Sequence, residues 1–484
     1  MEDLKGRAVR GGLARLCGQA GTLVLRVGFM VIMARLLNPE DFGLVAMVTV
    51  VTGVFEIFTT AGLSLATIQR VTVSHEQIST LFWVNILVGA ALCLVCLATA
   101  PLLVGFYHEP RLFWLTVAVG AGFVFAAAGV QHSALLQRQL RYIDLTVIEL
   151  ASLLASYAIG IGMALGGLGY WALVGSAIAQ PAITSSLTWW AAAWMPGMPS
   201  RGVNIHSMLR FGGTIVLNNL VIYIAYNFDK LLLGRVWGAD VLGLYGRAYQ
   251  LINVPMSGLH SAVGGVAFSA LSRLQEDPIR LRNYFLKGYS LVNAMTVPIA
   301  VFGGLFADEI VLVVLGPKWT ESAAIFRLLM PTILVFGLIN PTGWLLQSVG
   351  LHGRSLQIAF VIAPLVIVAC LIGSPYGPEG VALAFSAAMT LWLIPHLVWC
   401  SYNTVVSAFD LLAMVYRPVL ASAVAAAFAF GFEHYFGSVL SPLLRLLWGG
   451  GVMVTIYMLM LLFVLGQKEF YFDLIKGLRS SAAQ

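Results

Sequence analysis

The chain has 484 residues, of which 60% are hydrophobic and only 10% are charged, and its formal net charge is +6. A soluble domain carries about 25% charged residues, so this composition excludes a soluble enzyme or binding module and predicts a membrane protein. The basic excess does not indicate nucleic-acid binding, because most Lys and Arg residues fall in the connections on one side of the predicted spans. The five cysteines lie in apolar context without paired spacing, so we expect neither disulfides nor a metal site.

Apolar runs recur along the whole chain, and each is long enough to cross a bilayer. They predict an all-α polytopic membrane protein with about fourteen transmembrane helices. The connections are too short for a separate catalytic or nucleotide-binding domain. The predicted spans are 15–37, 42–67, 78–104, 112–136, 144–165, 170–192, 211–233, 241–267, 288–314, 323–347, 355–373, 379–401, 417–437 and 443–466.

Two helix starts carry capping signals. Ser74 is followed three residues later by Gln77, which is the pattern of a capping box at the start of the third span. Asp277 precedes Pro278, so we expect an aspartate N-cap with proline in the first helical turn of the ninth span.

The chain contains an internal repeat. The segment Arg35–Leu44 recurs as Arg235–Leu244 about 200 residues later, and Gly167 returns further on as Gly377. Each copy has an even number of spans, so both copies enter the membrane from the same side. We therefore expect a parallel repeat whose pseudo-two-fold axis runs along the membrane normal.

The repeat predicts the organisation of the chain. Residues 1–194 and 211–401 form two six-helix lobes, and the basic segment 195–210 joins them on the cytoplasmic side. Residues 402–484 add two helices and a tail, so both termini are expected in the cytoplasm. Many transporters build a substrate path between two such halves, which makes transport the first functional hypothesis.

Polar stripes run along one face of the first and seventh spans at helical spacing. A charged group at mid-bilayer costs about 2.5–3.5 kcal/mol on insertion scales, so each one needs an explanation. At the repeat offset Gln19 falls on Asn219 and Arg26 on Tyr226. This agreement predicts a water-filled cavity shared by the two halves. The predicted substrate-binding residues are Arg26, Gln19, Thr22, Asn219, Tyr223, Tyr226, Lys230 and Arg247.

Two acidic residues within the spans, Glu56 and Asp229, are candidate coupling-ion sites. Each also has a structural interpretation. Glu56 is a candidate for a buried pair with Arg26 across adjacent helices. Asp229 is a candidate for a helix-packing pair, with Arg247 as its partner. Asp229 and Lys230 are neighbours, so they point about 100° apart on a helix and cannot both face one site.

No catalytic pattern is present. The sequence contains no G-x-x-x-x-G-K-[ST] phosphate loop, no G-x-S-x-G and no H-E-x-x-H. We therefore expect a protein that is not an enzyme and that has no catalytic residue, cofactor or metal ion.

Segments of the sequence resemble a known family. Ala34–Met47, Gly62–Ser64, Ile68–Arg70 and Ser79–Asn85 are similar to bacterial lipid-linked oligosaccharide flippases, and so is the turn Gly316–Trp319. These flippases form the polysaccharide transporter family of the multidrug/oligosaccharidyl-lipid/polysaccharide exporter superfamily. The similarity is greatest to the branch that exports colanic acid and teichuronic acid.

The resemblance implies two six-helix lobes around a central cavity, with two additional C-terminal helices, in the bacterial inner membrane. It implies a monomer that flips undecaprenyl-diphosphate-linked oligosaccharide units to the periplasmic leaflet by alternating access. Its partners would be this substrate, membrane lipids and, as a candidate, a polysaccharide polymerase or export complex. A diphosphate needs a cationic donor, which Arg26 supplies. Sugar hydroxyls suit Gln19, Asn219, Tyr223 and Tyr226.

Two alternatives stay open. An ion-coupled multidrug antiporter of the same superfamily would have a net-acidic cavity with an aromatic lining, whereas here Arg26, Lys230 and Arg247 balance Glu56 and Asp229. A membrane glycosyl- or phosphotransferase would need clustered acidic residues or a large loop on one side, and neither is visible in the sequence.

Overall fold

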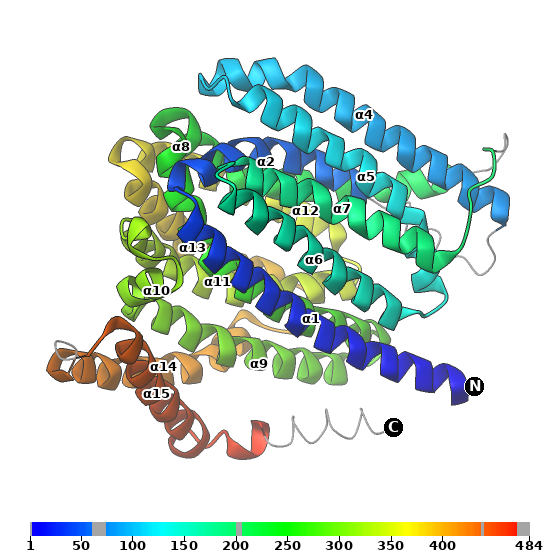
Figure 1. The fold of residues 1–484 in the computed structure, drawn as a ribbon. Coiled ribbons are helices and arrows are strands. Elements are labelled where there is room, and N and C mark those ends of the chain that lie inside the picture. Colours follow the sequence, from blue (N-terminus) through cyan, green and yellow to red (C-terminus); the bar gives the residue numbers. More distant parts are fainter. Residues whose placement is uncertain (1, 61–73, 200–205, 437–439, 472–484) are drawn as a thin grey trace. The chain divides into compact units, whose positions relative to one another are not determined.

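The computed structural model describes residues 2–60, 74–199, 206–436 and 440–471. Within these ranges the chain is helical and has no β-strand, which confirms the all-α prediction (Figure 1). Nine segments of the described residues are long and apolar enough to cross a membrane, so this is a multi-span membrane protein, although the predicted count of about fourteen spans is not confirmed. The chain forms two compact units, Met1–Gly246 and Arg247–Gln484. The six-helix lobes and their linker at 195–210 remain predictions.

In the first unit, α5 packs between α4 and α7, α6 lies beside α7, and α1 lies beside α6 (Figure 1). A part of α8, up to Gly246, completes this unit. The helix bounds are α1 Glu2–Leu36, α2 Pro39–Thr60, α4 His75–Tyr107, α5 Leu112–Arg138, α6 Tyr142–Leu165, α7 Trp171–Ala192 and α8 His206–Arg273.

In the second unit, α11 packs between α9 and α13, α12 lies beside α13, and α14 packs against both α9 and α15. The α-helix bounds are α9 Pro278–Leu305, α10 Ala307–Val314, α11 Ser322–Ser348, α12 His352–Gly373, α13 Gly377–Ser401, α14 Ala408–Phe436 and α15 Pro442–Leu459. The shorter elements are the 3-10 turns Pro317–Trp319 and Ser374–Tyr376 and the π-turn Met460–Val464.

The internal packing of the two units repeats in the order that the sequence repeat predicts. The helices α4, α5, α6 and α7 correspond to α9, α11, α12 and α13, and each set has the same neighbours within its own unit. Gly167 and Gly377, which are equivalent in the repeat, both adopt φ 76°. Only glycine reaches this left-handed region without a steric penalty. The two copies therefore share this positive φ as well as a sequence pattern.

Both predicted helix starts are confirmed. The Gln77 N–H donates to Ser74 Oγ at 3.2 Å and the Ser74 N–H donates to Gln77 Oε1 at 3.1 Å, which is a complete capping box. The Arg280 N–H donates to Asp277 Oδ1 at 3.0 Å, and Pro278 is the first residue of α9.

Three predicted spans differ from the structure in where the helices are divided. The spans 211–233 and 241–267 lie in one element, α8, which is interrupted only at Gly238 (φ 85°, ψ −176°). The span 288–314 is divided at Phe306, where φ −105° and ψ 32° separate α9 from α10. The Phe306 ring is fully buried, and a Cβ on Gly449 would lie 2.4 Å from its Cζ. The break therefore depends on packing against α15, which an apolar run cannot reveal.

We expect Gly167→Ala and Gly377→Ala each to lower the stability of the protein by about 1–2 kcal/mol, because alanine is strained at φ 76°. The apparent unfolding temperature of the purified protein in detergent measures this loss. Gly162→Ala and Gly343→Ala are matched controls, since a Cβ at either helical position meets no atom within 4 Å. Equal behaviour of the test variants and the controls would contradict the prediction.

Candidate functional site

Both copies of the repeated segment form corners between helices. In the first copy α1 ends at Leu36 and α2 begins at Pro39, where a missing N–H is tolerated. The Asn38 N–H donates to Asp41 Oδ2 at 3.1 Å and so caps the start of α2. In the second copy, the left-handed Gly238 makes the corner within α8.

The two corners contact each other through backbone atoms. A Cβ on Gly43 would lie 1.7 Å from the carbonyl oxygen of Ala239, and a Cβ on Gly243 would lie 1.9 Å from that of Pro39. Residues 39 and 239, like 43 and 243, are 200 positions apart (239 − 39 = 243 − 43), so the two contacts are equivalent in the repeat. We call these four residues the motif contact. Each copy makes the same contact with the other, as expected for two segments related by a two-fold axis. At either glycine there is room only for a hydrogen atom and not for a side chain.

The contact continues along α2 and the first part of α8. The Tyr223 hydroxyl lies within hydrogen-bond distance of the carbonyl oxygens of Thr49 (3.2 Å) and Val50 (3.1 Å). A Cβ on Gly53 would lie 2.0 Å from that hydroxyl, so the tyrosine occupies the space that the glycine leaves. At Gly234 a Cβ would lie 3.3 Å from Met47 Cγ. Small residues thus bring α2 and α8 close together, as is common between membrane helices.

Polar groups connect the motif contact to the loop between α4 and α5. Arg111 Nη2 donates to Glu40 Oε1 at 2.6 Å, and Arg111 Nε donates to Glu109 Oε1 at 2.8 Å. The hydrogen bond from Arg111 holds the pKa of the Glu109 carboxyl below its usual range. These side chains are partly exposed, and such pairs contribute about 0–1 kcal/mol. They orient the loop more than they stabilise it.

Arg26 is exposed at the middle of Gly18–Leu36, one of the segments that can cross a membrane. On the same helix Thr22 is buried, and the buried Oε1 of Gln19 has no hydrogen-bond partner among the described residues. The stripe adjoins the contact of α1 with α6, because Phe29, less than one turn after Arg26, stacks its ring on that of Tyr157 with centroids 4.0 Å apart.

Glu56 is also exposed, on α2, about one turn beyond Gly53, where the Tyr223 hydroxyl packs. The structure thus brings together two residues that the sequence had placed on separate stripes. The pairing of Glu56 with Arg26 and the role of Glu56 as a coupling-ion site both remain predictions.

Asp229 is fully buried on α8 and accepts two hydrogen bonds. The Tyr245 hydroxyl donates to its Oδ2 at 2.7 Å, and the Lys230 N–H donates to its Oδ1 at 2.7 Å. The Lys230 ammonium instead donates to Asn227 Oδ1 at 2.8 Å. Tyr245 is thus a packing partner of Asp229 that the sequence did not suggest, and it connects α8 across the interruption at Gly238.

The remaining predicted residues are spread over both units. Asn219 is exposed and Tyr226 is half-buried, both on the first part of α8. Arg247 begins the second unit, where its Nη1 donates to Gln250 Oε1 at 2.5 Å.

Sequence reasoning missed the motif contact and Tyr245. The repeat had already aligned Gly43 with Gly243, so a glycine that occupies the same place in both copies was the available signal. For Tyr245 the sequence held no signal, because the tyrosine and Asp229 lie in different predicted spans.

Comparison with known proteins decides the family. The model of the polysaccharide biosynthesis protein family matches residues 32–324, a range that contains both copies of the motif. The chain belongs to this family. One relative is lipopolysaccharide biosynthesis protein WzxC of Escherichia coli K12. It is 26% identical to this chain over 415 residues, which is 83% of this chain and 80% of WzxC. Teichuronic acid biosynthesis protein TuaB of Bacillus subtilis 168 is 29% identical over 297 residues, which is 60% of each chain. The family resemblance expected from the sequence is confirmed.

A solved structure has the same fold as this member of the polysaccharide biosynthesis protein family. The lipid II flippase MurJ in an inward closed conformation superposes with a TM-score of 0.74 at 14% identity, over 96% of this chain and all of that chain. At this identity the likeness concerns the fold alone.

We expect Gly43→Ala and Gly243→Ala to destabilise the protein by about 1–3 kcal/mol each, because a methyl group would overlap a carbonyl oxygen. Either methyl separates the same two corners, so the double variant should lose less stability than the sum of the single losses. Apparent unfolding temperatures in detergent measure both effects. Gly28→Ala is the control, since a Cβ there meets no atom within 4 Å. Strict additivity would show that the two glycines act independently.

We expect Tyr245→Phe to cost about 1.5–3 kcal/mol, because it removes a hydrogen bond to a buried carboxylate. Asp229→Asn combined with Tyr245→Phe should then cost less than the two single losses added together. Thermal unfolding of the four proteins of this cycle gives the coupling energy, with the exposed Tyr376→Phe as control. A coupling of zero, together with loss of transport in Asp229→Asn alone, would favour the coupling-ion interpretation of Asp229.

Proposed function

We propose that this protein flips an undecaprenyl-diphosphate-linked oligosaccharide unit from the cytoplasmic to the periplasmic leaflet of a bacterial inner membrane, by alternating access. Membership of the polysaccharide biosynthesis protein family and the relatives WzxC and TuaB support a role in polysaccharide assembly. MurJ, whose fold this chain shares, is a lipid II flippase. In this proposal both termini lie in the cytoplasm, and the chain works as a monomer.

One observation carries the proposal: Arg26 is exposed at the middle of a membrane-spanning segment. A guanidinium in contact with lipid tails would be costly, so an exposed arginine at this depth indicates a path that contains water. Within such a path it offers up to five N–H donors, which suit the paired oxygens of a diphosphate.

Other predicted residues take part in the same proposal in different ways. The unpartnered Oε1 of Gln19 and the exposed Asn219 are available to sugar hydroxyls. Glu56 remains the candidate for tuning or coupling, since it is exposed on the neighbouring α2. The Tyr223 hydroxyl and the Asp229 carboxylate already have partners, so we assign these two groups to structure.

The motif contact gives alternating access a physical basis. Two backbones in direct contact close one end of α2 and α8, and on the expected topology this end is the periplasmic one. We propose that the described state is closed there and that opening requires the two corners to separate. A packed interface of this kind has discrete arrangements rather than continuous ones.

An ion-coupled multidrug antiporter of the same superfamily is the second candidate, and the family match does not favour it. A membrane glycosyl- or phosphotransferase is less consistent with the chain, whose described residues contain no group of three metal-binding side chains. We assign this protein no catalytic step. A polysaccharide polymerase or export complex is a proposed partner.

The test is complementation of a strain that lacks its own exopolysaccharide flippase. We expect wild type to restore polymer and Arg26→Ala to reduce it about 10-fold or more, since hydrogen bonds to charged groups contribute about 1.5–3 kcal/mol. Arg26→Lys should be intermediate, because lysine keeps the charge but loses the planar donor geometry. Arg280→Ala, at an exposed position near the start of α9, is the control, and membrane levels are matched.

Restoration by every variant would contradict the role of Arg26 and leave only the family and the fold. Failure of wild type together with increased drug resistance would favour the antiporter. Glu56→Gln in the same strain tests coupling, which predicts that polymer yield changes its dependence on external pH or sodium.

A further inference from the structure

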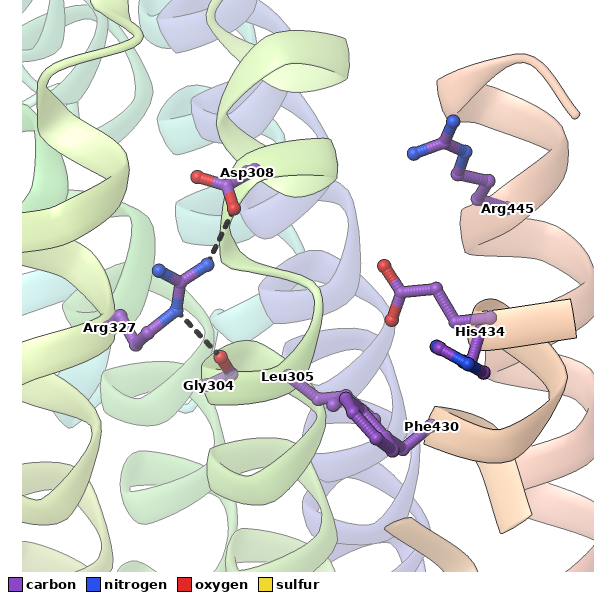
Figure 2. A pocket seen from close by; sticks show the side chains of 8 residues that line it. Gly304, Leu305, Asp308, Arg327, Phe430, His434 and Arg445 are labelled. Atoms are coloured by element: carbon purple, nitrogen blue, oxygen red, sulfur yellow. Dashed lines mark hydrogen bonds and ion pairs between the residues drawn. The ribbon is translucent and has the colours of Figure 1, made fainter. Parts of the chain in front are cut away.

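The second unit contains a cavity of about 630 Å³, and none of the predicted site residues lines it. It lies where α9 ends and α11 begins, and where α14 ends close to α15 (Figure 2). Its volume falls within the range of about 300–1,000 Å³ that is typical of small-molecule sites. The polar and aromatic lining residues are Asp308, Arg327, Phe430, Glu433, His434 and Arg445, and we call this site the α14 cavity.

One wall of the α14 cavity is held in place by Arg327. Its Nη2 donates to Asp308 Oδ2 at 2.6 Å and its Nε donates to the carbonyl oxygen of Gly304 at 3.3 Å (Figure 2). A guanidinium has five N–H donors, so these two bonds fix the group and leave donors for a ligand. On another wall Arg445 donates to Leu440 O at 3.1 Å and pairs with Glu309 at 3.4 Å.

The side chains from α14 offer acceptors and an aromatic surface. Glu433 is half-buried, and neither it nor His434 makes a hydrogen bond within the described residues. The ring of Phe430 is close to parallel with that of His434, with centroids 6.5 Å apart and an interplanar angle of 20°. Phe430 is 59% exposed, so a flat apolar surface is open beside unused acceptors.

This combination of groups selects a class of ligand. The lining holds two guanidinium groups, of Arg327 and Arg445, and two carboxylates, of Asp308 and Glu433, so its charges balance and a free anion gains little. A sugar ring has an apolar C–H face for an aromatic side chain, and its rim of hydroxyls both donates and accepts hydrogen bonds. Carboxylates held in fixed positions accept hydrogen bonds from these hydroxyls, and guanidinium groups donate hydrogen bonds to them.

We propose that the α14 cavity is a second saccharide site, which holds sugar residues of the oligosaccharide after it has crossed the membrane. This inference rests on the proposed function, because the topology proposed there places the ends of α9 and α14 on the periplasmic side of the membrane. The helices α14 and α15 have no equivalent in the first half of the repeat. The site would therefore be a property of the additional C-terminal helices and not of the repeated transport unit.

The test measures binding of a lipid-free oligosaccharide to the purified full-length protein in detergent by saturation-transfer NMR. The probe is prepared by depolymerising the exopolysaccharide made by the parent of the flippase-deficient test strain, so it is available whether or not complementation succeeds. We expect binding to wild type, and about tenfold weaker binding to Phe430→Ala and to Glu433→Gln. Phe428→Ala is the matched control, because Phe428 is equally exposed on α14 but lines a different surface.

Absence of binding to wild type would overturn the inference, and so would equal affinity of wild type and both test variants. Inorganic phosphate that displaced the oligosaccharide would identify an anion site and would also overturn it. Failure of wild type in the complementation experiment, with saccharide binding intact and sensitive to Phe430→Ala, would reject the proposed function and retain the site. The two proposals therefore fail in different experiments.

Discussion

The contact between the two copies of the repeated motif is the constraint on which the first unit depends. Gly43 and Gly243 each face a carbonyl oxygen of the other copy at a distance that admits no side chain. Membrane helices gain no hydrophobic free energy by associating in lipid, so close packing and internal hydrogen bonds must hold them together. Glycine at both positions allows the two backbones to come into direct contact at a local two-fold axis. The helices α2 and α8 also approach each other closely at Gly53 and Gly234.

The same constraint explains which polar side chains are structural. A buried polar group within the membrane must find its partner inside the protein. Tyr223 bonds to the backbone of α2, and Asp229 bonds to Tyr245 across the interruption of α8. These bonds hold the corner of α8 in the position that the motif contact requires. Arg26 differs from them because its side chain is exposed at the middle of a membrane-spanning segment, where water or a polar substrate is a favourable neighbour.

The chain thus combines two kinds of structure. The repeated helices have equivalent internal packing in each unit, down to the left-handed Gly167 and Gly377. The helices α14 and α15 stand outside the repeat and, with α9 and α11, surround a cavity of balanced charge. A transport unit under pseudo-symmetry has little freedom to specialise, because each copy must fit the other. Additional helices carry no such restriction, which makes them a suitable place for recognition.

The sequence by itself determined the helical class, the start of the helices at Ser74 and Asp277, and the repeat. Each of these depends on neighbours in the chain: an apolar run, a cap three residues away, or a segment that recurs. Only the tertiary structure decided that Gly43 meets Ala239, that Tyr245 bonds to Asp229, and that Phe306 divides a predicted span. Helical periodicity identifies the polar face of a helix but not the residue opposite it, so the sequence proposed Arg247 as the partner of Asp229. The partners of a buried group are fixed by packing between segments that are distant in the chain, and one sequence carries no direct record of that packing.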